Sequence, residues 1–450
     1  MGAFHAYDIR GIYNKDFNKE TVYKIGFFLP ELLKTKKVLV GRDARESSPE
    51  IYRALLDGIT DAGADVYDLG LATTPMVYFA TARYGYTASA QITASHNPRE
   101  YNGIKVSREN ALPVGLDSGL GTIKEWIETR TTVPSAKKGS VYPLDVKEEY
   151  LSFLMKYKGD YTSLNIGMDI SNGMAALFIK EIMGRGGDNL HYIFDEMDGT
   201  FPNHEANPLA PENIVDLQKL VKEKKCDIGV IFDGDADRVM FVDENSRFIS
   251  PDLMIAVLGH YFLKNGGETG AVLQDIRSSK AVGEYLSPMG ATMHTWKVGR
   301  AFAAPKLREI KGIYGGELAG HYYFRDFFYS DSGIMAALII LDVVAQMKKE
   351  GVSLSQLIGR IEKYHNSGEI NFRIEKKKEA MDKVRSHFLS AETPVANYDF
   401  DGYRVEFPDW WFNIRPSNTE PFLRFIAEAK SESSLKEKIE KVKELLKEFE

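Results

Sequence analysis

Residues 38–69 read VLVGRDARESSPEIYRALLDGITDAGADVYDL, and residues 73–93 continue with TTPMVYFATARYGYTASAQIT. Short apolar runs alternate here with amphipathic stretches. Ser48, Pro49 and Glu50 supply an N-cap, a first-turn proline and a first-turn acid, which predict the start of a helix. The expected elements are strand, helix, strand, helix and strand, at 38–41, 51–64, 65–69, 74–84 and 88–93. This order is typical of a mostly parallel sheet with helices on its faces.

The same alternation recurs further along the 450 residues, a length that fits about three domains. A polar stretch at 131–140 is expected to be a linker. The second block is predicted to hold strands at 165–170 and 227–232 and helices at 174–185 and 213–225. The third block, 250–351, is predicted to hold strands at 271–275 and 292–296 and a closing helix at 334–349.

The last 85 residues have a different pattern. They predict strands with little helix between them, at 370–374, 398–407, 411–414 and 423–427. An apolar stripe at spacings of three and four then runs from Leu435 to Phe449, which predicts one terminal helix. We expect a smaller α+β domain here.

Composition excludes several classes of protein. The formal net charge is −7 and the sequence pI is about 5.8, which disfavours non-specific nucleic-acid binding. The single cysteine, Cys226, rules out an internal disulfide and fits a reducing compartment. The longest apolar run, 334–341, is too short to span a membrane, and no signal peptide is recognisable. We therefore expect a cytoplasmic protein without nucleic-acid or membrane partners.

Thr93-Ala94-Ser95-His96-Asn97-Pro98 directly follows a predicted strand. Open α/β sheets place ligands at the carboxyl ends of their strands, and Asn-Pro ends regular structure there. The Ser95 hydroxyl beside His96 could act as a nucleophile or carry a phosphoryl group. The alternative, favoured for a Ser-His pair taken alone, is a polar turn.

Asp233-Gly234-Asp235-Ala236-Asp237-Arg238 lies between two apolar strands. Three carboxylates at alternate positions suit a hard divalent cation, and the suspected phosphate chemistry favours Mg²⁺. An EF-hand calcium loop is excluded, because Arg238 stands where that loop needs glycine and strands rather than helices flank it. A purely structural acidic turn is disfavoured by charge repulsion.

Two further motifs could bind a phosphosugar. Arg415-Pro416-Ser417-Asn418-Thr419-Glu420-Pro421 offers a guanidinium, hydroxyls and an amide to a terminal phosphate, with a polar hairpin as the alternative. In Gly315-Gly316-Glu317-Leu318-Ala319-Gly320-His321, Glu317 could accept hydrogen bonds from sugar hydroxyls. Basic groups at Arg10 and Lys105, alone, indicate structural ion pairs more readily than a site.

Together these motifs supply a hydroxyl carrier, a cation, basic residues and a distant phosphate clamp, the components of phosphoryl transfer. The sequence has no nucleotide-binding Walker A or kinase glycine loop. The phosphoryl group could therefore reside on Ser95 itself.

The four motifs, in this order, resemble those of the α-D-phosphohexomutase superfamily, the phosphomannomutases and phosphoglucomutases. The resemblance covers essentially the whole chain. It implies four domains in a heart-shaped arrangement, three α/β and one α+β, each giving one loop to the active site. The expected domains are 1–140, 141–248, 249–362 and 363–450.

The resemblance also implies roles for residues at matching positions. Ser95 would be the phosphoserine, and Asp233, Asp235 and Asp237 would hold Mg²⁺ with a Ser95 phosphate oxygen. Arg10, His96 and Lys105 would be candidates for acid–base work around the transferred group. The substrate contacts would be Tyr7, Arg238, Lys297, Arg300, Glu317, Arg415, Ser417, Asn418 and Thr419.

The implied reaction interconverts hexose 6-phosphate and hexose 1-phosphate through a hexose 1,6-bisphosphate, in a monomer or homodimer. Two departures bear on the sugar: Ala319 stands where many relatives have serine, and Arg300 replaces a histidine of the bifunctional enzymes. The run after His321 resembles phosphomannomutases, so mannose phosphate is expected, with glucose phosphate also accepted. The rivals are a phosphoglucosamine mutase, a Mg²⁺-dependent phosphatase and a non-catalytic phosphosugar-binding protein.

Overall fold

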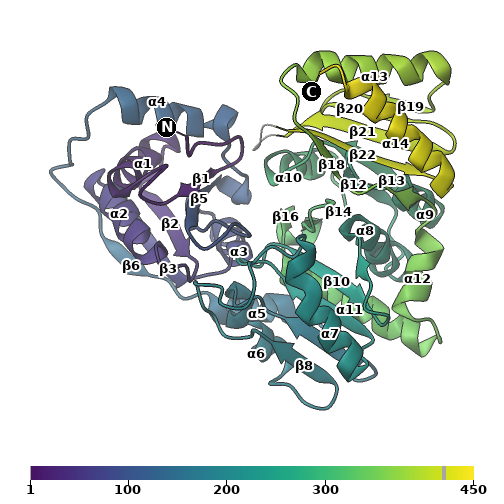
Figure 1. Ribbon diagram of the computed structural model, residues 1–450. Coiled ribbons are helices and arrows are strands. Elements are labelled where there is room, and N and C mark those ends of the chain that lie inside the picture. The colour runs from purple at the N-terminus through teal and green to yellow at the C-terminus, as the bar shows by residue number, and fades with distance from the viewer. Residues whose placement is uncertain (1, 418–421, 450) are drawn as a thin grey trace.

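The computed structural model describes residues 2–417 and 422–449, which form four domains in an arc (Figure 1). The first domain lies at one end of the arc and the fourth at the other, with the second and third between them. The expected architecture of three similar mixed α/β domains and a C-terminal α+β domain is confirmed.

The first domain has a six-stranded sheet in the order β1-β5-β4-β2-β3-β6. Its strands are β1 Ile9–Ile12, β2 Lys37–Arg42, β3 Asp65–Leu71, β4 Ala88–Ile92, β5 Tyr101–Arg108 and β6 Val141–Pro143. Its helices are α1 Lys19–Leu32, α2 Ser48–Asp61, α3 Thr74–Arg83 and α4 Leu120–Thr129. Strand β6 pairs with β3, so this sheet reaches past the expected boundary at residue 140.

Helix α2 begins earlier than the sequence predicts. Ser47 is the N-cap, and Ser48 lies inside the first turn. The Ser48 hydroxyl donates a hydrogen bond to the Asp43 carboxylate instead of capping the helix. The predicted capping role of Ser48 is therefore wrong, because a buried carboxylate competes for its hydroxyl.

The second domain has a five-stranded sheet in the order β11-β10-β9-β7-β8. Its strands are β7 Ile166–Asp169, β8 Leu190–Ile193, β9 Ile228–Phe232, β10 Val239–Asp243 and β11 Phe248–Ile249. Its helices are α5 Lys147–Met155, α6 Ile179–Met183 and α7 Val215–Lys224. The helix expected at 174–185 is instead a 3-10 turn at Met174–Leu177 and the short α6, because the buried Phe178 leaves the helical conformation between them.

The third domain repeats this topology in the order β13-β12-β14-β15-β16. Its strands are β12 Gly270–Asp275, β13 Ala291–Trp296, β14 Tyr314–Gly316, β15 Tyr322–Phe324 and β16 Ser330–Asp331. Its helices are α8 Pro251–Gly259, α9 Lys280–Leu286, α10 Arg300–Glu309, α11 Gly333–Lys349 and α12 Leu354–Ile361. The first turns of α11 are buried on all sides and pack against α8 and against β10 of the second domain, which joins the two cores.

The fourth domain has an antiparallel sheet in the order β17-β22-β21-β20-β19, with β18 also paired to β22. Its strands are β17 His365–Asn366, β18 Ile370–Phe372, β19 Ala396–Tyr398, β20 Tyr403–Glu406, β21 Trp410–Pro416 and β22 Leu423–Ala429. Its helices are α13 Lys377–Ala391 and α14 Glu432–Leu446. Both helices pack against each other, and the domain has its own apolar core.

Two expectations for this last domain are wrong. The strand expected at 398–407 is two strands, because the chain reverses between them at Gly402, which has a φ of +65°. The expectation of little helix overlooks α13, which is rich in charged residues. Its buried stripe of Met381, Val384 and Phe388 has helical spacing, so the signal was present in the sequence.

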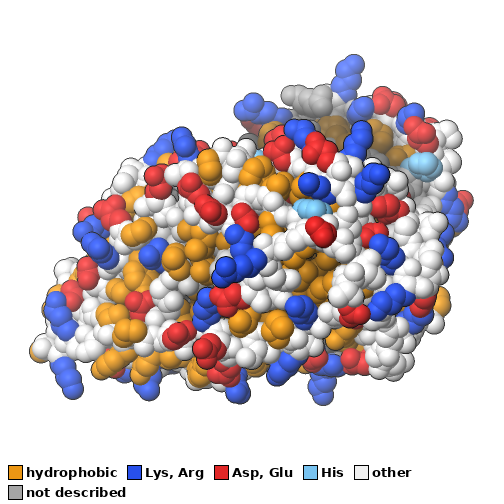
Figure 2. All heavy atoms as spheres, turned by 90° about the horizontal axis from the view of Figure 1, so that it is seen from below, with side chains coloured by type: hydrophobic (Ala, Val, Ile, Leu, Met, Phe, Trp, Pro, Cys, Tyr) orange, Lys and Arg blue, Asp and Glu red, His pale blue; other side chains and the backbone are white. Residues whose placement is uncertain are grey.

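The third and fourth domains meet through buried polar groups. The Arg404 guanidinium donates to the carbonyl oxygens of Ile276 and Ser278. The Glu428 carboxylate accepts hydrogen bonds from the Ser279 hydroxyl at 2.7 Å and from the Trp411 indole N–H at 2.8 Å. On the exposed face shown in Figure 2, by contrast, acidic and basic side chains are interspersed.

The Glu428 contact makes the stability of this junction depend on pH. Burial raises the pKa of Glu428 from 4.5 to about 7, and the Asp252 carboxylate adds to the rise. The folded state therefore keeps a proton that the unfolded chain releases. The stabilisation that the protonated Glu428 carboxyl contributes to the folded state is complete below pH 4.5 and is lost as the pH rises through about 7.

As the pH rises from 4.5 to about 7, we expect the free energy of unfolding of the wild type to fall by about 3 kcal/mol more than that of Glu428→Gln. Urea unfolding across the range measures it, with the exposed Glu432→Gln as the control. Parallel pH curves for wild type and Glu428→Gln would contradict the assignment.

Candidate active site

The three α/β domains place their chemical motifs on equivalent loops. In each sheet a central strand (β2, β7 or β12) lies between two parallel neighbours, and the later neighbour (β4, β9 or β14) pairs antiparallel with the next strand. The connection after that later neighbour carries Ser95 in the first domain, Asp233–Asp237 in the second and Glu317 in the third. Each motif therefore lies at the carboxyl end of a strand, where such sheets bind ligands.

Ser95 is held in a constrained and buried position. Its φ is +52°, a left-handed conformation that non-glycine residues seldom adopt and that occurs often at functional sites. Its hydroxyl donates to Asp233 Oδ2 at 2.8 Å, across 138 residues of sequence. The Nδ1 atom of His96 is 3.3 Å from the same hydroxyl. The fold thus joins the first two predicted motifs into one site.

The loop that carries Ser95 is anchored by Arg45, a residue that sequence reasoning missed. The Arg45 guanidinium donates four hydrogen bonds of 2.7–3.1 Å to backbone carbonyls of this loop, those of Ser95, Asn97, Pro98 and Tyr101. It also forms an ion pair with Asp43, and its side chain is completely buried. Nothing in the local sequence distinguishes Arg45 from a surface arginine of the same segment.

We expect Arg45→Met to lower kcat about 10²-fold, because the Ser95 loop loses the donors that fix its backbone. The free energy of unfolding should fall by about 3 kcal/mol, since Asp43 is left buried without its cation. Urea unfolding and steady-state kinetics measure the two effects. Arg45→Lys should regain stability but not kcat, and the exposed Arg53→Met is the matched control. Equal recovery of both quantities in Arg45→Lys would argue against a positioning role.

The three aspartates of the second motif form a buried cluster whose ligand atoms lie within 4.8 Å of one another. Burial, together with the charges of Asp235 and Asp237, raises the pKa of Asp233 well above its ordinary value. Asp235 Oδ1 and Asp237 Oδ1 have no hydrogen-bond partner within residues 2–417 and 422–449. These crowded, unsatisfied carboxylate oxygens fit a hard divalent cation.

Positive groups surround this cluster. Lys105 Nζ contacts Asp235 Oδ2 at 2.7 Å and Asp237 Oδ2 at 2.6 Å. Burial alone lowers the pKa of Lys105, but the two carboxylates outweigh it and hold the pKa well above the ordinary value. Arg10 pairs with Asp8 and donates to Asn97 Oδ1 at 2.7 Å. Burial, and then the charges of Arg238 and the other nearby cations, lower the pKa of His96, which favours its neutral form.

A cavity of about 180 Å³ opens beside these groups, between the first three domains. Predicted site residues that line it are Tyr7, Arg10, Lys105, Asp237, Arg238, Arg300 and Glu317. Glu317 is buried; it accepts hydrogen bonds from the Tyr323 hydroxyl at 2.6 Å and from Gly299 N at 3.2 Å. Arg300 pairs with Asp331 at 3.0 Å and stacks on the Tyr78 ring. The guanidinium of Arg300 is therefore held firmly at the wall of this cavity.

A second buried cluster, Asp237, His321 and Asp331, links the second and third domains. His321 Nδ1 lies 2.6 Å from Asp331 Oδ2, and Arg238 Nε lies 2.9 Å from His321 Nε2. These contacts fix the Arg238 side chain at the cavity wall. The sequence places His321 in the glycine-rich motif but gives it no role at the site, because its partner Asp331 lies outside that motif, ten residues further along the chain.

Of the fourth motif, the described residues Arg415 and Ser417 do not line the cavity. Arg415 Nε pairs with Asp401 at 3.0 Å, and Ser417 N donates to the carbonyl of Phe422. Asn418 and Thr419 fall outside the described residues. Lys297 Nζ lies over the Phe302 ring rather than at the cavity wall.

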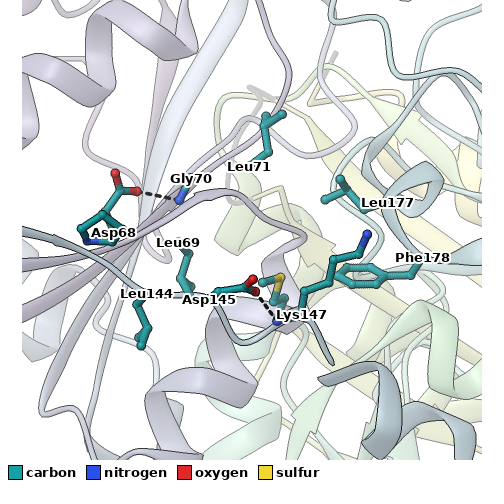
Figure 3. Close-up of a pocket in the computed structure, with 11 residues that line it drawn as sticks. Asp68, Leu69, Gly70, Leu71, Leu144, Asp145, Lys147, Leu177 and Phe178 are labelled. Atoms are coloured by element: carbon teal, nitrogen blue, oxygen red, sulfur yellow. Dashed lines mark hydrogen bonds between the residues drawn. The ribbon is translucent and has the colours of Figure 1, made fainter. Parts of the chain in front are cut away.

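A larger pocket, of about 360 Å³, lies between the first and second domains (Figure 3). Its polar groups are mostly satisfied locally: Asp68 accepts from Gly70 N at 2.6 Å, and Lys147 Nζ pairs with Glu181. Its walls include Leu69, Leu71 and Phe178. This pocket contains none of the predicted site residues, so the smaller cavity is the candidate active site.

Comparison with known proteins identifies the family. Models of the phosphoglucomutase/phosphomannomutase family match the chain in order: alpha/beta/alpha domain I at 1–133, domain II at 148–246, domain III at 250–364 and the C-terminal domain at 369–445. The chain is 36% identical to a phosphomannomutase of Methanocaldococcus jannaschii over 99% of this chain and 97% of that protein. A phosphomannomutase of Escherichia coli is 36% identical over 99% of both chains.

The fold agrees with a solved structure. The crystal structure of a phosphoglucomutase/phosphomannomutase family protein from Burkholderia thailandensis has a TM-score of 0.87 and 27% identity, and the match covers 99% of this chain and 97% of that chain. Among the described residues, no helix combines the length and the apolar character needed to cross a membrane. The four matched domains and the full-length relatives show that this chain is a mutase of the phosphoglucomutase/phosphomannomutase family.

Proposed function

We propose that this mutase interconverts hexose 6-phosphate and hexose 1-phosphate, with mannose phosphate as the preferred substrate and glucose phosphate also accepted. The observation that carries the proposal is the Ser95 hydroxyl, 2.8 Å from the buried aspartate cluster and next to a cavity lined by cations. The names of the relatives, several of them phosphomannomutases, support the choice of sugar. We expect the protein to act in the cytoplasm as a monomer or homodimer.

In the proposed reaction Ser95 carries the phosphoryl group. The bond between Ser95 Oγ and phosphorus breaks as a free sugar hydroxyl forms its own bond to that phosphorus. The sugar hydroxyl gives up its proton to a base, and the departing Ser95 Oγ takes up a proton to become the serine hydroxyl. The product is a hexose 1,6-bisphosphate. After this intermediate reorients in the site, the Ser95 hydroxyl gives up its proton to a base and forms a bond to the phosphorus of the other phosphoryl group. The bond from that phosphorus to the sugar oxygen breaks, and the sugar oxygen takes up a proton.

The residues around Ser95 fit this transfer. Lys105, Arg10 and Arg238 would stabilise the charge on the phosphoryl oxygens. Neutral His96, 3.3 Å from the hydroxyl, has a nitrogen that can take up a proton. Asp233, Asp235 and Asp237 would hold Mg²⁺, which when bound neutralises phosphoryl charge.

The residues that bind the rest of the substrate must accept it in two orientations, because either phosphate of the bisphosphate has to reach Ser95. Glu317, whose carboxylate is held by Tyr323 and Gly299, would accept hydrogen bonds from the sugar hydroxyls. Arg415, with Ser417, Asn418 and Thr419, would bind the phosphate that does not react. Most of the catalytic effect then comes from positioning and charge.

The test is a coupled mutase assay on mannose 1-phosphate, glucose 1-phosphate and glucosamine 1-phosphate, with Mg²⁺ and a trace of hexose 1,6-bisphosphate. We expect turnover in the order mannose, glucose, glucosamine. If glucosamine 1-phosphate were turned over fastest, it would replace mannose phosphate as the assigned substrate. No turnover of any sugar by metal-loaded, phosphorylated protein would overturn the proposal.

A further inference from the structure

Asp401 joins two parts of the protein that belong to different domains. It lies in the turn between β19 and β20 of the fourth domain. One carboxylate oxygen pairs with Arg415 Nε at 3.0 Å, and the other accepts a hydrogen bond from Val298 N at 2.9 Å. Val298 belongs to the third domain and lines the candidate active-site cavity, whereas Arg415 does not line it.

The backbone around Asp401 holds this carboxylate in place. At Gly402, a Cβ atom would lie 2.2 Å from the carbonyl oxygen of Ile414, so only glycine allows the turn to approach β21 so closely. On the other side of Asp401, the Phe400 ring packs on Trp296 of the third domain, with ring centroids 5.2 Å apart. The turn is therefore fixed against both domains.

Val298 and Arg415, the two partners of Asp401, each have a contact or a buried donor that relates them to substrate binding. The carbonyl of Val298 accepts a hydrogen bond from the Tyr7 hydroxyl at 3.3 Å, and the next residue, Gly299, donates to Glu317. In Arg415, the Nη2 atom is buried and has no hydrogen-bond partner among the described residues. With Nε engaged by Asp401, this terminal nitrogen is left to donate to an anion.

We propose that Asp401 is a positioning residue that couples Arg415, which would bind the non-reacting phosphate, to the loop at 297–300, which contacts the sugar-binding Glu317. The inference rests on the proposed function, which assigns a phosphosugar to this site. Asp401 orients the Arg415 guanidinium and at the same time fixes the Val298 amide, so that the far phosphate and the sugar are held in one geometry.

A carboxylate is the group that this position requires. It faces two donors, a guanidinium N–H and a backbone N–H, and it has an acceptor oxygen for each. An asparagine of the same size would turn its NH₂ group toward one of these donors and would lose the charge that pairs with Arg415. Asp401→Asn therefore breaks one link while it preserves the volume of the turn.

The test compares Asp401→Asn with Asp399→Asn, which makes the same change at an exposed position of the same turn. For Asp401→Asn we expect KM and the calorimetric Kd for mannose 1-phosphate to rise about tenfold, with kcat changed less than about threefold, because the lost interaction holds ground state and transition state alike. Amide hydrogen exchange of the 294–301 segment should become faster without ligand. Asp399→Asn should match the wild type in all these measurements.

The outcomes separate this inference from the proposed function. If the wild type turns over hexose phosphate but the two variants behave alike in KM, Kd and exchange, the role of Asp401 is overturned and the proposed function stands. A fall in kcat at unchanged KM would also overturn it. If the wild type neither turns over nor binds any hexose phosphate, the proposed function fails first, and this inference fails with it. Should Asp401→Asn lose its fold, Asp401→Glu, which keeps the charge but moves the oxygens, should still raise KM above the wild-type value.

Discussion

Ser95→Ala is expected to lower kcat for hexose phosphate interconversion by at least about 10⁴-fold. The alanine removes the oxygen that serves as phosphoryl carrier in the proposed mechanism and puts no nucleophile in its place. The affinity for hexose phosphate should change little, because Ser95 does not line the cavity. Steady-state assays measure the first effect and calorimetry the second.

Protein mass provides an independent check of this prediction. After incubation with hexose 1,6-bisphosphate, the wild type should become heavier by one phosphoryl group, and Ser95→Ala should not. Ser107→Ala, a change of a buried serine on β5 outside the cavity, is the matched control and should retain activity and the added mass. Substantial turnover or phosphorylation in Ser95→Ala would exclude Ser95 as the carrier.

Asp235→Asn is expected to lower kcat/KM about 10³-fold at a fixed Mg²⁺ concentration. Asp235 presents a buried oxygen without a hydrogen-bond partner among the described residues, and its other oxygen accepts from Thr74 and Lys105. The asparagine can still accept from Thr74, but it offers the cation a neutral oxygen. Assays across a range of Mg²⁺ concentrations measure the loss, with the partly exposed Asp216→Asn as control.

Thermal stability distinguishes a lost metal site from a damaged fold. Mg²⁺ should raise the Tm of the wild type, because a ligand that binds only the folded state stabilises it. In Asp235→Asn that rise should shrink, whereas the Tm in EDTA should not fall, since one of three crowded negative charges is removed. An unchanged Mg²⁺-induced rise would mean that Asp235 is not a ligand.

Local sequence patterns predict much of the fold. The alternation of short apolar runs and amphipathic stretches gives the repeated α/β domains, since sheets and helices bury their faces with periods that the sequence displays. The patterns fail where tertiary contacts override them. Ser48 bonds to Asp43 instead of capping α2, and the buried Phe178 interrupts a predicted helix. Helix α13 is the opposite case. Its apolar stripe has helical spacing in the sequence, but the many charged residues around it led to the helix being overlooked.

The sequence also singled out the candidate residues for the proposed chemistry. Ser95, the three aspartates and Glu317 stand out because each follows an apolar strand with side chains suited to phosphate, metal or sugar. Ser95 and Asp233 are 138 residues apart, and the equivalent loops of successive domains bring them within hydrogen-bonding distance. The motifs thus specify the parts of the site, and the repeated topology specifies where they meet.

The tertiary structure alone decided which residues hold those parts in place. Arg45 binds the carbonyls of the Ser95 loop, His321 and Asp331 fix Arg238, and Asp401 connects Arg415 to Val298. These residues act on partners that are distant in sequence, and several of the partners are backbone groups, which every residue possesses. A side chain that recognises backbone leaves no pattern in the sequence, so its role becomes visible only when the fold has placed it.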